Sequence, residues 1–276
     1  MIVSKAHVPL GDIRPVFHGF GPLVVPRPGG WPAQAEVWGY WWPARPNGWQ
    51  PSAELVDFLE AGPPPVFIGF GSMAPGHGER LSELVAAAVR QAGARQAGVR
   101  AVVQAGWAEL SGWGDDVLAI GDVPHDWLFP RTAAVVHHAG ASTTGAGLRV
   151  GVPAVAVPVM ADQPFWASRL YELGVAPRPV LFQDLTAEAL RDAITVCLSE
   201  PAHRRRAAEL AHRITAENGA AAVLTHIGSE DARQMRGMLH HRAAVTGRPM
   251  RSAAFGAAET REHLERDRPP GRLPES

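Results

Sequence analysis

The chain has 276 residues, of which 46% are hydrophobic and 19% charged, and its formal net charge is −1. These values fit a soluble globular protein and exclude an overall basic field that would attract nucleic acid or an anionic membrane. Cys197 is the single cysteine, which excludes an internal disulfide framework and a cysteine-based zinc site. We therefore expect a cytoplasmic protein that has no nucleic-acid partner and no stable membrane insertion.

Residues 1–62 have little helical or strand periodicity, and their start lacks the apolar core of a signal peptide. The stretch 31–49 is dense in tryptophan and proline, and proline removes helical hydrogen bonds. We expect an extended linker here, packed on a domain. A short amphipathic helix should follow, with Ser52 as its N-cap and Gly62 just beyond its end.

Residues 63–227 alternate between short apolar runs and helical patterns. The runs lie at 65–72, 99–106, 116–123, 133–138 and 153–159, and the longer helical patterns at 79–93, 142–151, 163–174, 186–200 and 201–217. This alternation predicts βαβ units and an α/β domain with a doubly wound parallel sheet covered on both faces. The most apolar run, 150–161, is too short and too interrupted by proline to span a membrane.

Residues 228–276 are rich in Arg, Gly, Pro and Ala and poor in large apolar residues, so we expect a poorly ordered tail. Its adjacent His240 and His241 are interpreted as solvated rather than metal-binding.

Ligands of open α/β sheets sit at the carboxyl ends of the strands, and one such end reads HHAGASTTG, from His137 to Gly145. The first N–H groups of a helix starting there have no internal partner and suit phosphate. The hydroxyls of Ser142 and Thr143 and the imidazole of His138 add further donors. The alternative is a helix start with Ser/Thr capping and a satisfied histidine, and the loop by itself leaves both open.

Asp162 and Gln163 follow the next strand and supply acceptors and donors for vicinal sugar hydroxyls, although Asp162 alone also fits a plain N-cap. Neither glycine-rich loop has the G-x-G-x-x-G or P-loop spacing, which disfavours NAD enzymes and ATPases. The sequence contains no D-x-D pair, so we expect a diphosphate to be bound without a metal between two aspartates.

The stretch 137–177 closely resembles the donor-binding signature of family 1 glycosyltransferases of the GT-B fold. The nearest branch contains the bacterial glycopeptide-antibiotic and sterol-type UDP-glucosyltransferases. "PPPVFIGFGSM" resembles the first strand of that family's C-terminal domain, and "GDVPHDWLFPRTAAVVHHAG" its base-binding loop. The resemblance covers roughly residues 20–220.

The resemblance implies a role for each matching residue. The diphosphate would contact His138, the loop Gly140, Ala141, Ser142 and Thr143, and the hydroxyl of Ser72. Asp162 and Gln163 would hold the sugar hydroxyls, and Val123 and His125 would face the base. Ala139 and Ala141 depart from the glycines frequent in this branch, and Trp107, Trp113 and Trp127 are interpreted as packing aromatics.

By resemblance we expect inverting, metal-independent transfer of a hexose from a UDP- or dTDP-sugar, with no further cofactor. The acceptor would be a lipid, sterol, polyketide or peptide natural product. The family's catalytic base lies in an N-terminal domain for which residues 1–62 leave too little chain, and His7 and His18 are poor substitutes. The division expected is a remnant at 1–62, a donor-binding domain at 63–227 and a tail at 228–276.

Three interpretations stay open at this point: a truncated transferase, a donor-binding subunit working with a separate acceptor-binding chain, and a non-catalytic nucleotide-sugar-binding module. In the second, the tryptophan-rich stretch 31–49 would be a candidate interface.

Overall fold

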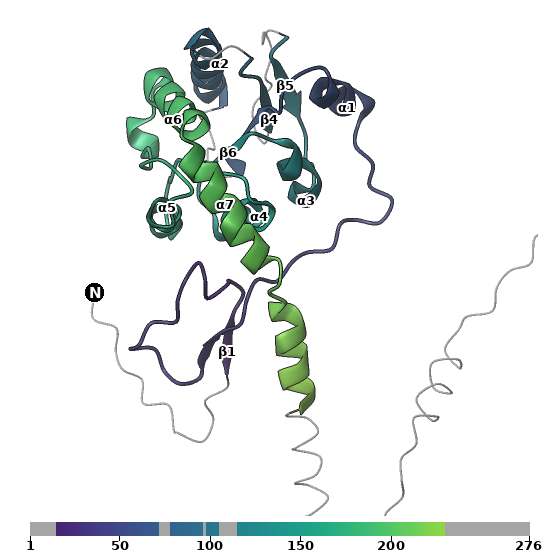
Figure 1. The fold of residues 1–276 in the computed structure, drawn as a ribbon, viewed down its shortest axis with the longest axis vertical. Helices are drawn as coiled ribbons and strands as arrows, with labels where there is room; N and C mark the ends of the chain where they lie inside the picture. Colours follow the sequence, from purple (N-terminus) through teal and green to yellow (C-terminus); the bar gives the residue numbers. More distant parts are fainter. Residues whose placement is uncertain (1–14, 72–77, 96–97, 105–114, 230–276) are drawn as a thin grey trace, which may run out of the picture. The chain divides into compact units, whose positions relative to one another are not determined.

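The structure is a computed structural model that describes residues 15–71, 78–95, 98–104 and 115–229. Backbone contacts divide the chain into Met1–Leu224 and Thr225–Ser276, and the elements named below all lie in the first unit. The strands are β1 (Val16–His18), β2 (Ala35–Val37), β3 (Val66–Gly69), β4 (Ala101–Gln104), β5 (Val117–Ile120), β6 (Ala134–His137) and β7 (Ala154–Ala156). The helices are α1 (Ala53–Glu60), α2 (Gly78–Arg95), α3 (His125–Leu128), α4 (Ala141–Val150), α5 (Gln163–Glu172), α6 (Ala187–Ser199) and α7 (Pro201–Ile214) (Figure 1).

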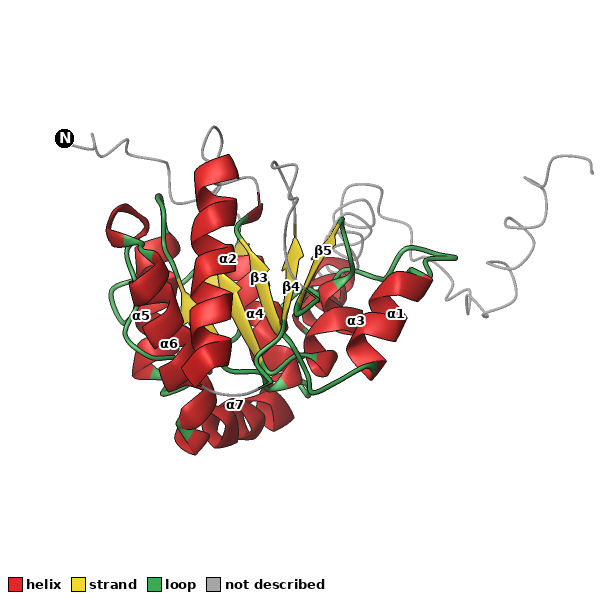
Figure 2. Ribbon diagram, turned by 90° about the horizontal axis from the view of Figure 1, so that it is seen from above, coloured by secondary structure: helices red, strands yellow, loops and turns green. Residues whose placement is uncertain are grey.

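Strands β3 to β7 form one parallel sheet with the spatial order β5-β4-β3-β6-β7. The chain first moves outward from β3 to β5 and then returns to place β6 on the other side of β3. Helices cover both faces of the sheet, as Figure 2 shows. The predicted doubly wound α/β fold is therefore confirmed, and its switch point lies between β3 and β6, where Gly69 pairs with His137.

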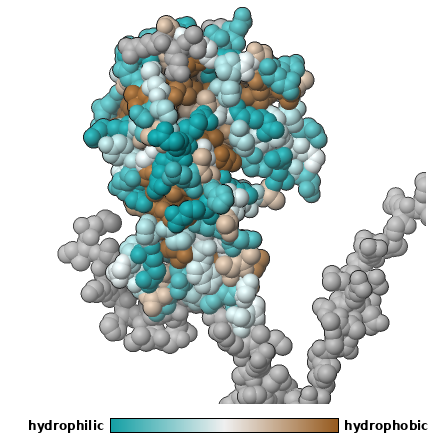
Figure 3. All heavy atoms as spheres, viewed as in Figure 1, coloured by the Kyte–Doolittle hydropathy of each residue, from teal (hydrophilic) through white to brown (hydrophobic). Residues whose placement is uncertain are grey.

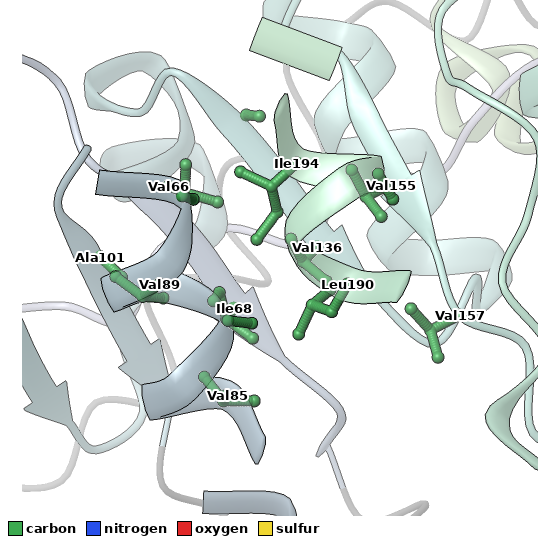
Figure 4. Packing of buried hydrophobic residues seen from close by; sticks show 14 of the residues in the cluster. Val66, Ile68, Val85, Val89, Ala101, Val136, Val155, Val157, Leu190 and Ile194 are labelled. Atoms are coloured by element: carbon green, nitrogen blue, oxygen red, sulfur yellow. The ribbon is translucent and has the colours of Figure 1, made fainter. Parts of the chain in front are cut away.

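One face of the sheet packs against α2 and α6. Alternate strand residues such as Val66 and Ile68 of β3 meet Val85 and Val89 of α2, and Leu190 of α6 closes the cluster (Figure 4). These side chains are at most 2% exposed. Because the side chains of a strand alternate between faces, the intervening residues must pack elsewhere.

The other face packs against α1, α3 and α4. Phe67 of β3 and Val102 of β4 point to this side, where they meet Leu55 of α1 and Leu128 of α3. A third cluster joins α4, α5, α7 and the N-terminal segment, with Leu148, Trp166 and Leu210 among its members. Burial on both faces explains why the strands read as nearly continuous apolar runs.

Helix boundaries follow the capping residues. Ser52 accepts a hydrogen bond from the Leu55 amide at 3.2 Å, and Gly62 directly follows the C-cap Ala61 of α1, both as predicted. Thr186 caps α6 and Pro201 begins α7, in agreement with the helical patterns predicted at 186–200 and 201–217.

The segment before α1 is more ordered than its sequence indicates. β1 and β2 pair in parallel, with Val16 opposite Ala35, although the sequence predicts no strand here. Each strand is three residues long, too short to show an alternating pattern. The segment also packs on the main domain as expected, because the ring of Tyr40 lies so close to Gly145 of α4 that a Cβ there would collide with it.

The surface is mixed in character. Figure 3 shows hydrophilic residues along the outer side of α7, where Arg205 and Glu209 are exposed. Within the part of the chain that is described, no helix combines the length and apolar character needed to cross a membrane.

Candidate functional site

The carboxyl edge of the sheet gathers the polar residues predicted to form the site. β6 ends at His137, β7 is followed by the loop 157–162, and β5 leads into the loop that carries Val123 and His125. His137 pairs with Gly69 at the end of β3, His138 lies against Gly71 just after that strand, and the His125 ring lies 6.0 Å from that of Phe67 in β3. The pKa of His138 is also influenced by the charge of Asp162. The structure thus brings together the described residues from three of the predicted site segments.

A tight turn links β6 to α4. His137 is 1% exposed, and its Nδ1 accepts a hydrogen bond of 3.1 Å from the Ala139 amide. Accepting at Nδ1 requires a neutral imidazole that carries its proton on Nε2. Burial and the neighbouring histidines lower the pKa of His137 to about 3. Ala139 itself has a φ of 60°, the left-handed conformation that an alanine adopts at a cost of about 1–2 kcal/mol.

The N-terminus of α4 is uncapped. Its N-cap is Gly140, which has no side chain to accept from the first turn, and the first backbone bond of the helix is from Thr144 to Gly140 at 2.9 Å. The amides of Ala141, Ser142 and Thr143 are the helix-start donors without an intrahelical acceptor. Ser142 and Thr143 lie inside the first turn, so the alternative of Ser/Thr capping is wrong.

The His138 ring lies at this helix start, packed against two glycines, Gly140 and Gly71. A Cβ on Gly140 would lie 2.6 Å from His138 Nε2, and a Cβ on Gly71, after β3, would lie 3.4 Å from His138 Cε1. Nδ1 of His138 is buried and has no hydrogen-bond partner among the described residues. Burial lowers the pKa of His138, and the charge of Asp162 partly offsets that effect. The unpartnered Nδ1 favours a ligand-binding histidine over the alternative of a satisfied one.

The loop between β7 and α5 is held by hydrogen bonds between its own side chains and nearby groups of the same loop and helix. Gln163 is 4% exposed, and its Oε1 accepts from the amides of Val159 at 2.8 Å and Met160 at 3.0 Å. Asp162 occupies the N-cap position but does not cap, since its Oδ2 accepts instead from the Trp166 indole at 2.8 Å. The side chain of Asp162 is exposed, whereas that of Gln163 is buried.

The loop after β5 presents a neutral histidine. The His125 ring stacks on Phe129 with centroids 4.3 Å apart and planes 13° apart. Burial lowers the pKa of His125, against the opposing charges of Asp126 and Asp122. Val123 is half-buried beside it and packs against the cluster that contains Leu128.

The other sequence predictions fall outside this edge. Ser72, His7, Trp107, Trp113, His240 and His241 lie outside the described residues. Trp127 is a packing residue, since it meets Trp49 edge to face at 5.4 Å. His18 belongs to β1, where its Nδ1 donates to the Glu36 carbonyl at 3.2 Å. Across the described ranges, no group of three or more His, Cys, Asp or Glu is arranged to hold a metal ion.

Sequence reasoning missed residues that shape the site without carrying obvious chemistry. Gly71, with a φ of 55°, makes room for His138, and its position directly after an apolar strand was the available signal. His137 and His138 read as one pair in the sequence, although the structure buries one ring and leaves the other half-exposed. Only the i+4 spacing of Trp166 from Asp162 hinted at the contact between them.

Comparison with known proteins connects this geometry to a family. Residues 87–228 match the family described as "Erythromycin biosynthesis protein CIII-like, C-terminal domain". The O-mycaminosyltylonolide 6-deoxyallosyltransferase of Streptomyces fradiae is 45% identical over 211 residues, which cover 76% of this chain and 48% of that protein. The sterol 3-beta-glucosyltransferase UGT80A2 of Arabidopsis thaliana is 38% identical over 209 residues, covering 74% of this chain and 32% of that protein.

Solved glycosyltransferases share the fold. The glycosyltransferase VinC, whose structure was determined in complex with dTDP, has a TM-score of 0.51 and 26% identity, and the match covers 63% of this chain and 44% of VinC. The chain thus spans about half, or less, of the length of the relatives it matches. The family match, the relatives and the fold agree with one another: the chain belongs to the erythromycin biosynthesis protein CIII-like family and carries the C-terminal domain of a GT-B glycosyltransferase.

Proposed function

We propose that the chain is the donor-binding half of an inverting glycosyltransferase that moves a hexose from a UDP- or dTDP-sugar to a lipophilic acceptor. The observation that carries the proposal is the uncapped start of α4, where the free amides of Ala141, Ser142 and Thr143 meet the unpartnered His138. Free amides and the positive end of the helix dipole favour a bound anion. A diphosphate meets both needs of this site, negative charge and hydrogen-bond acceptors.

The sugar would lie at the end of β7. The Asp162 carboxylate is exposed and its charge acts on His138, which supports a sugar position beside the proposed diphosphate site. The indole of Trp166 orients the carboxylate, and the backbone of Val159 and Met160 orients the amide of Gln163. Two groups held in fixed rotamers recognise vicinal hydroxyls with little loss of side-chain entropy.

The base would lie toward Val123 and His125, on the opposite side of β3 from the sugar. The strand order β5-β4-β3-β6-β7 gives this direction, since the diphosphate site follows β6 and Asp162 follows β7. VinC was crystallised with dTDP bound, which supports a nucleoside diphosphate as the ligand of this chain.

In the proposed reaction an acceptor hydroxyl attacks the anomeric carbon while the bond from that carbon to the diphosphate oxygen breaks. The acceptor proton passes to a base, which we place in the part of the relatives that this chain does not span. The residues of this chain stabilise the leaving diphosphate, and donors aimed at developing charge make the greatest contribution to catalysis in many enzymes. Because the amides and His138 supply these donors, we propose that no metal is required.

The acceptor class follows from the relatives alone. One is named for a macrolide-type acceptor and the other for sterols, so we propose a polyketide or sterol-like acceptor. A non-catalytic binding module is not favoured, because these relatives are named as transferases. We place the activity in the cytoplasm, in keeping with the free buried thiol of Cys197.

Calorimetric titration of the full chain with UDP-glucose and dTDP-glucose tests the proposal. We expect saturable binding of at least one of them, and a loss of about tenfold or more in affinity for His138→Ala, which removes a hydrogen bond to a charged group. His212→Ala is the matched control, because His212 is exposed on α7. Absence of binding to both nucleotide sugars would contradict the proposal.

A further inference from the structure

We infer that Gln104 and Asp122 select the nucleobase, admitting a pyrimidine with a 2,4-dione (uracil or thymine) and rejecting cytosine. The inference rests on the proposed function, because the diphosphate at α4 sets where the base lies. It concerns Gln104, at the end of β4, to which the sequence gives no role, and Asp122, which lies in the stretch that resembles the family's base-binding loop but has no contact assigned to it. Their contact is a hydrogen bond of 2.9 Å from Gln104 Nε2 to Asp122 Oδ1.

The bond fixes which way the Gln104 amide faces. An ionised carboxylate only accepts hydrogen bonds, so the NH₂ group of Gln104 must be the end that meets Asp122. The amide oxygen Oε1 therefore faces away from Asp122. Without this bond the Gln104 amide could take either of two orientations; with it, the oxygen is the group left to accept a hydrogen bond from a ligand.

The Gln104 oxygen faces β3 and the switch point of the sheet. A Cβ on Gly69 would lie 3.2 Å from Gln104 Oε1 and 2.7 Å from the Phe67 ring, so the glycine at the end of β3 leaves room for both side chains. Gly69 in turn pairs with His137, next to the proposed diphosphate contact His138. With strands about 4.8 Å apart, the end of β4 is about 10 Å from the end of β6. A ribose belongs between these two points, and a base belongs beside Gln104.

The surroundings of Gln104 suit a flat, polar ring. Asp122 directly precedes Val123 in the loop that carries His125, and its charge acts on His125. One face of the His125 ring is covered by Phe129. The site thus offers a half-buried acceptor beside an imidazole and the apolar Val123.

Hydrogen-bond chemistry then discriminates between bases. Uracil and thymine carry N3–H, a donor that Gln104 Oε1 can accept. N3 of cytosine is itself an acceptor, so two lone pairs would face each other and the polar group would lose its partner. Sites that hydrogen-bond a ligand reject analogues lacking the partner more strongly than they reject a change of size.

The test compares UDP, dTDP and CDP by calorimetry on the full chain and on Gln104→Leu and Asp122→Asn. The wild-type chain should bind UDP and dTDP at least about tenfold more tightly than CDP, the value of one hydrogen bond with its desolvation. Gln104→Leu removes the acceptor, and Asp122→Asn lets the amide turn. Both should reduce the UDP-to-CDP ratio to less than about threefold. Because Asp122→Asn also removes a charge, the ratio is the readout rather than either affinity.

Gln91→Leu is the matched control, since Gln91 accepts from Arg191 at 3.0 Å between α2 and α6, and it should keep the wild-type ratio. A wild-type chain that binds UDP and CDP equally, or variants that keep the wild-type ratio, would overturn the inference and leave the proposed function standing. A wild-type chain that binds none of the three nucleotides would overturn both. Parallel changes for UDP and dTDP would show that the shared 2,4-dione is the group recognised.

Discussion

The loops after β6 and β7 share a backbone turn but differ in how their polar side chains are hydrogen-bonded. Each passes through a left-handed alanine, Ala139 with a φ of 60° and Ala161 with a φ of 56°, and each leads into a helix. After β7, Gln163 and Asp162 bond to groups of their own loop and helix. After β6, the helix starts at a glycine and His138 Nδ1 is left without a partner among the described residues.

This difference in hydrogen bonding indicates that the loop after β6 is the one whose polar groups need a ligand. Buried polar groups normally have partners, so an unsatisfied one needs an explanation. In the loop after β7, Gln163 Oε1 and Asp162 Oδ2 already have partners in the free chain, and these bonds contribute to stability whether or not a sugar is bound. The loop after β6 is incomplete, and its polar groups contribute once an anion binds. Substitutions in the two loops should therefore affect different measurements.

The largest effect is expected from Gln163→Leu in the self-bonded loop. The substitution leaves the amides of Val159 and Met160 without their acceptor, which we expect to cost about 3 kcal/mol of unfolding free energy, measured by chemical denaturation. Gln163→Glu keeps an acceptor oxygen and should lose less. A loss below about 0.5 kcal/mol for the leucine variant would show that this loop does not depend on these bonds.

Gly140→Ala should have the opposite effect, reducing ligand affinity while leaving the unfolding free energy nearly unchanged. Gly140 has a φ of −68° and a ψ of 146°, which any residue adopts, so the backbone is not strained. The added Cβ would collide with His138 Nε2, and we expect a loss of about 30-fold in nucleoside diphosphate affinity, or about 2 kcal/mol. Calorimetry measures this loss, with Gly147→Ala as control, because a Cβ there would come no closer than 4.0 Å to a neighbour. Equal affinities for both variants would contradict the claim that Gly140 must lack a side chain for His138 to bind the diphosphate.

The two loops should also differ in how stability depends on pH, because the buried His137 lies at the end of β6, next to the first loop. The pKa of His137 is about 3 in the folded chain and about 6.5 when unfolded. Its contribution to stability is therefore complete above pH 6.5 and is lost as the pH falls toward 3. The loss amounts to about 1.4 kcal/mol per pH unit, and the lowered pKa values of His125 and His138 act in the same direction.

Denaturation curves at about pH 7.5 and about pH 5.5, on either side of the unfolded-state pKa, measure this effect. His137→Asn, whose amide oxygen can accept from the Ala139 amide, should reduce the difference by about 1.4 kcal/mol. His212→Asn on exposed α7 should leave the difference as it is. An unchanged difference in the His137 variant would mean that this histidine is not held neutral.

The smallest effect concerns the shared turn. Ala161 is exposed, so Ala161→Gly loses little packing and relieves the left-handed strain, with an expected gain of about 0.5–1 kcal/mol in thermal denaturation. Ala139→Gly relieves the same strain but removes a fully buried methyl group, and should gain less. The reverse order would show that strain is not shared equally by the two turns.

The sequence predicts the fold well where patterns are long. Apolar runs buried on both faces and capped helices such as the one begun by Ser52 were readable because each depends on neighbouring residues. β1 and β2 were not predicted, since three residues carry no period and their pairing joins segments far apart in the chain.

Sequence also indicates the site in part. The resemblance selects His138, Asp162 and Gln163, and the structure places them at one edge of the sheet. It does not reveal that Gln163 bonds to its own loop or that Gly71 and Gly140 enclose an imidazole, because these contacts depend on three-dimensional packing. The bond between Gln104 and Asp122 joins the ends of two neighbouring strands, and no local pattern marks it.

The central claim is that a diphosphate is held by the free amides at the start of α4 together with His138. Its most direct test is a titration of UDP into the ¹⁵N-labelled full chain, followed through the amide resonances of Ala141, Ser142 and Thr143. We expect these three resonances and the His138 imidazole to shift together, saturating at one binding constant. Saturable binding that leaves all four unmoved would contradict the claim.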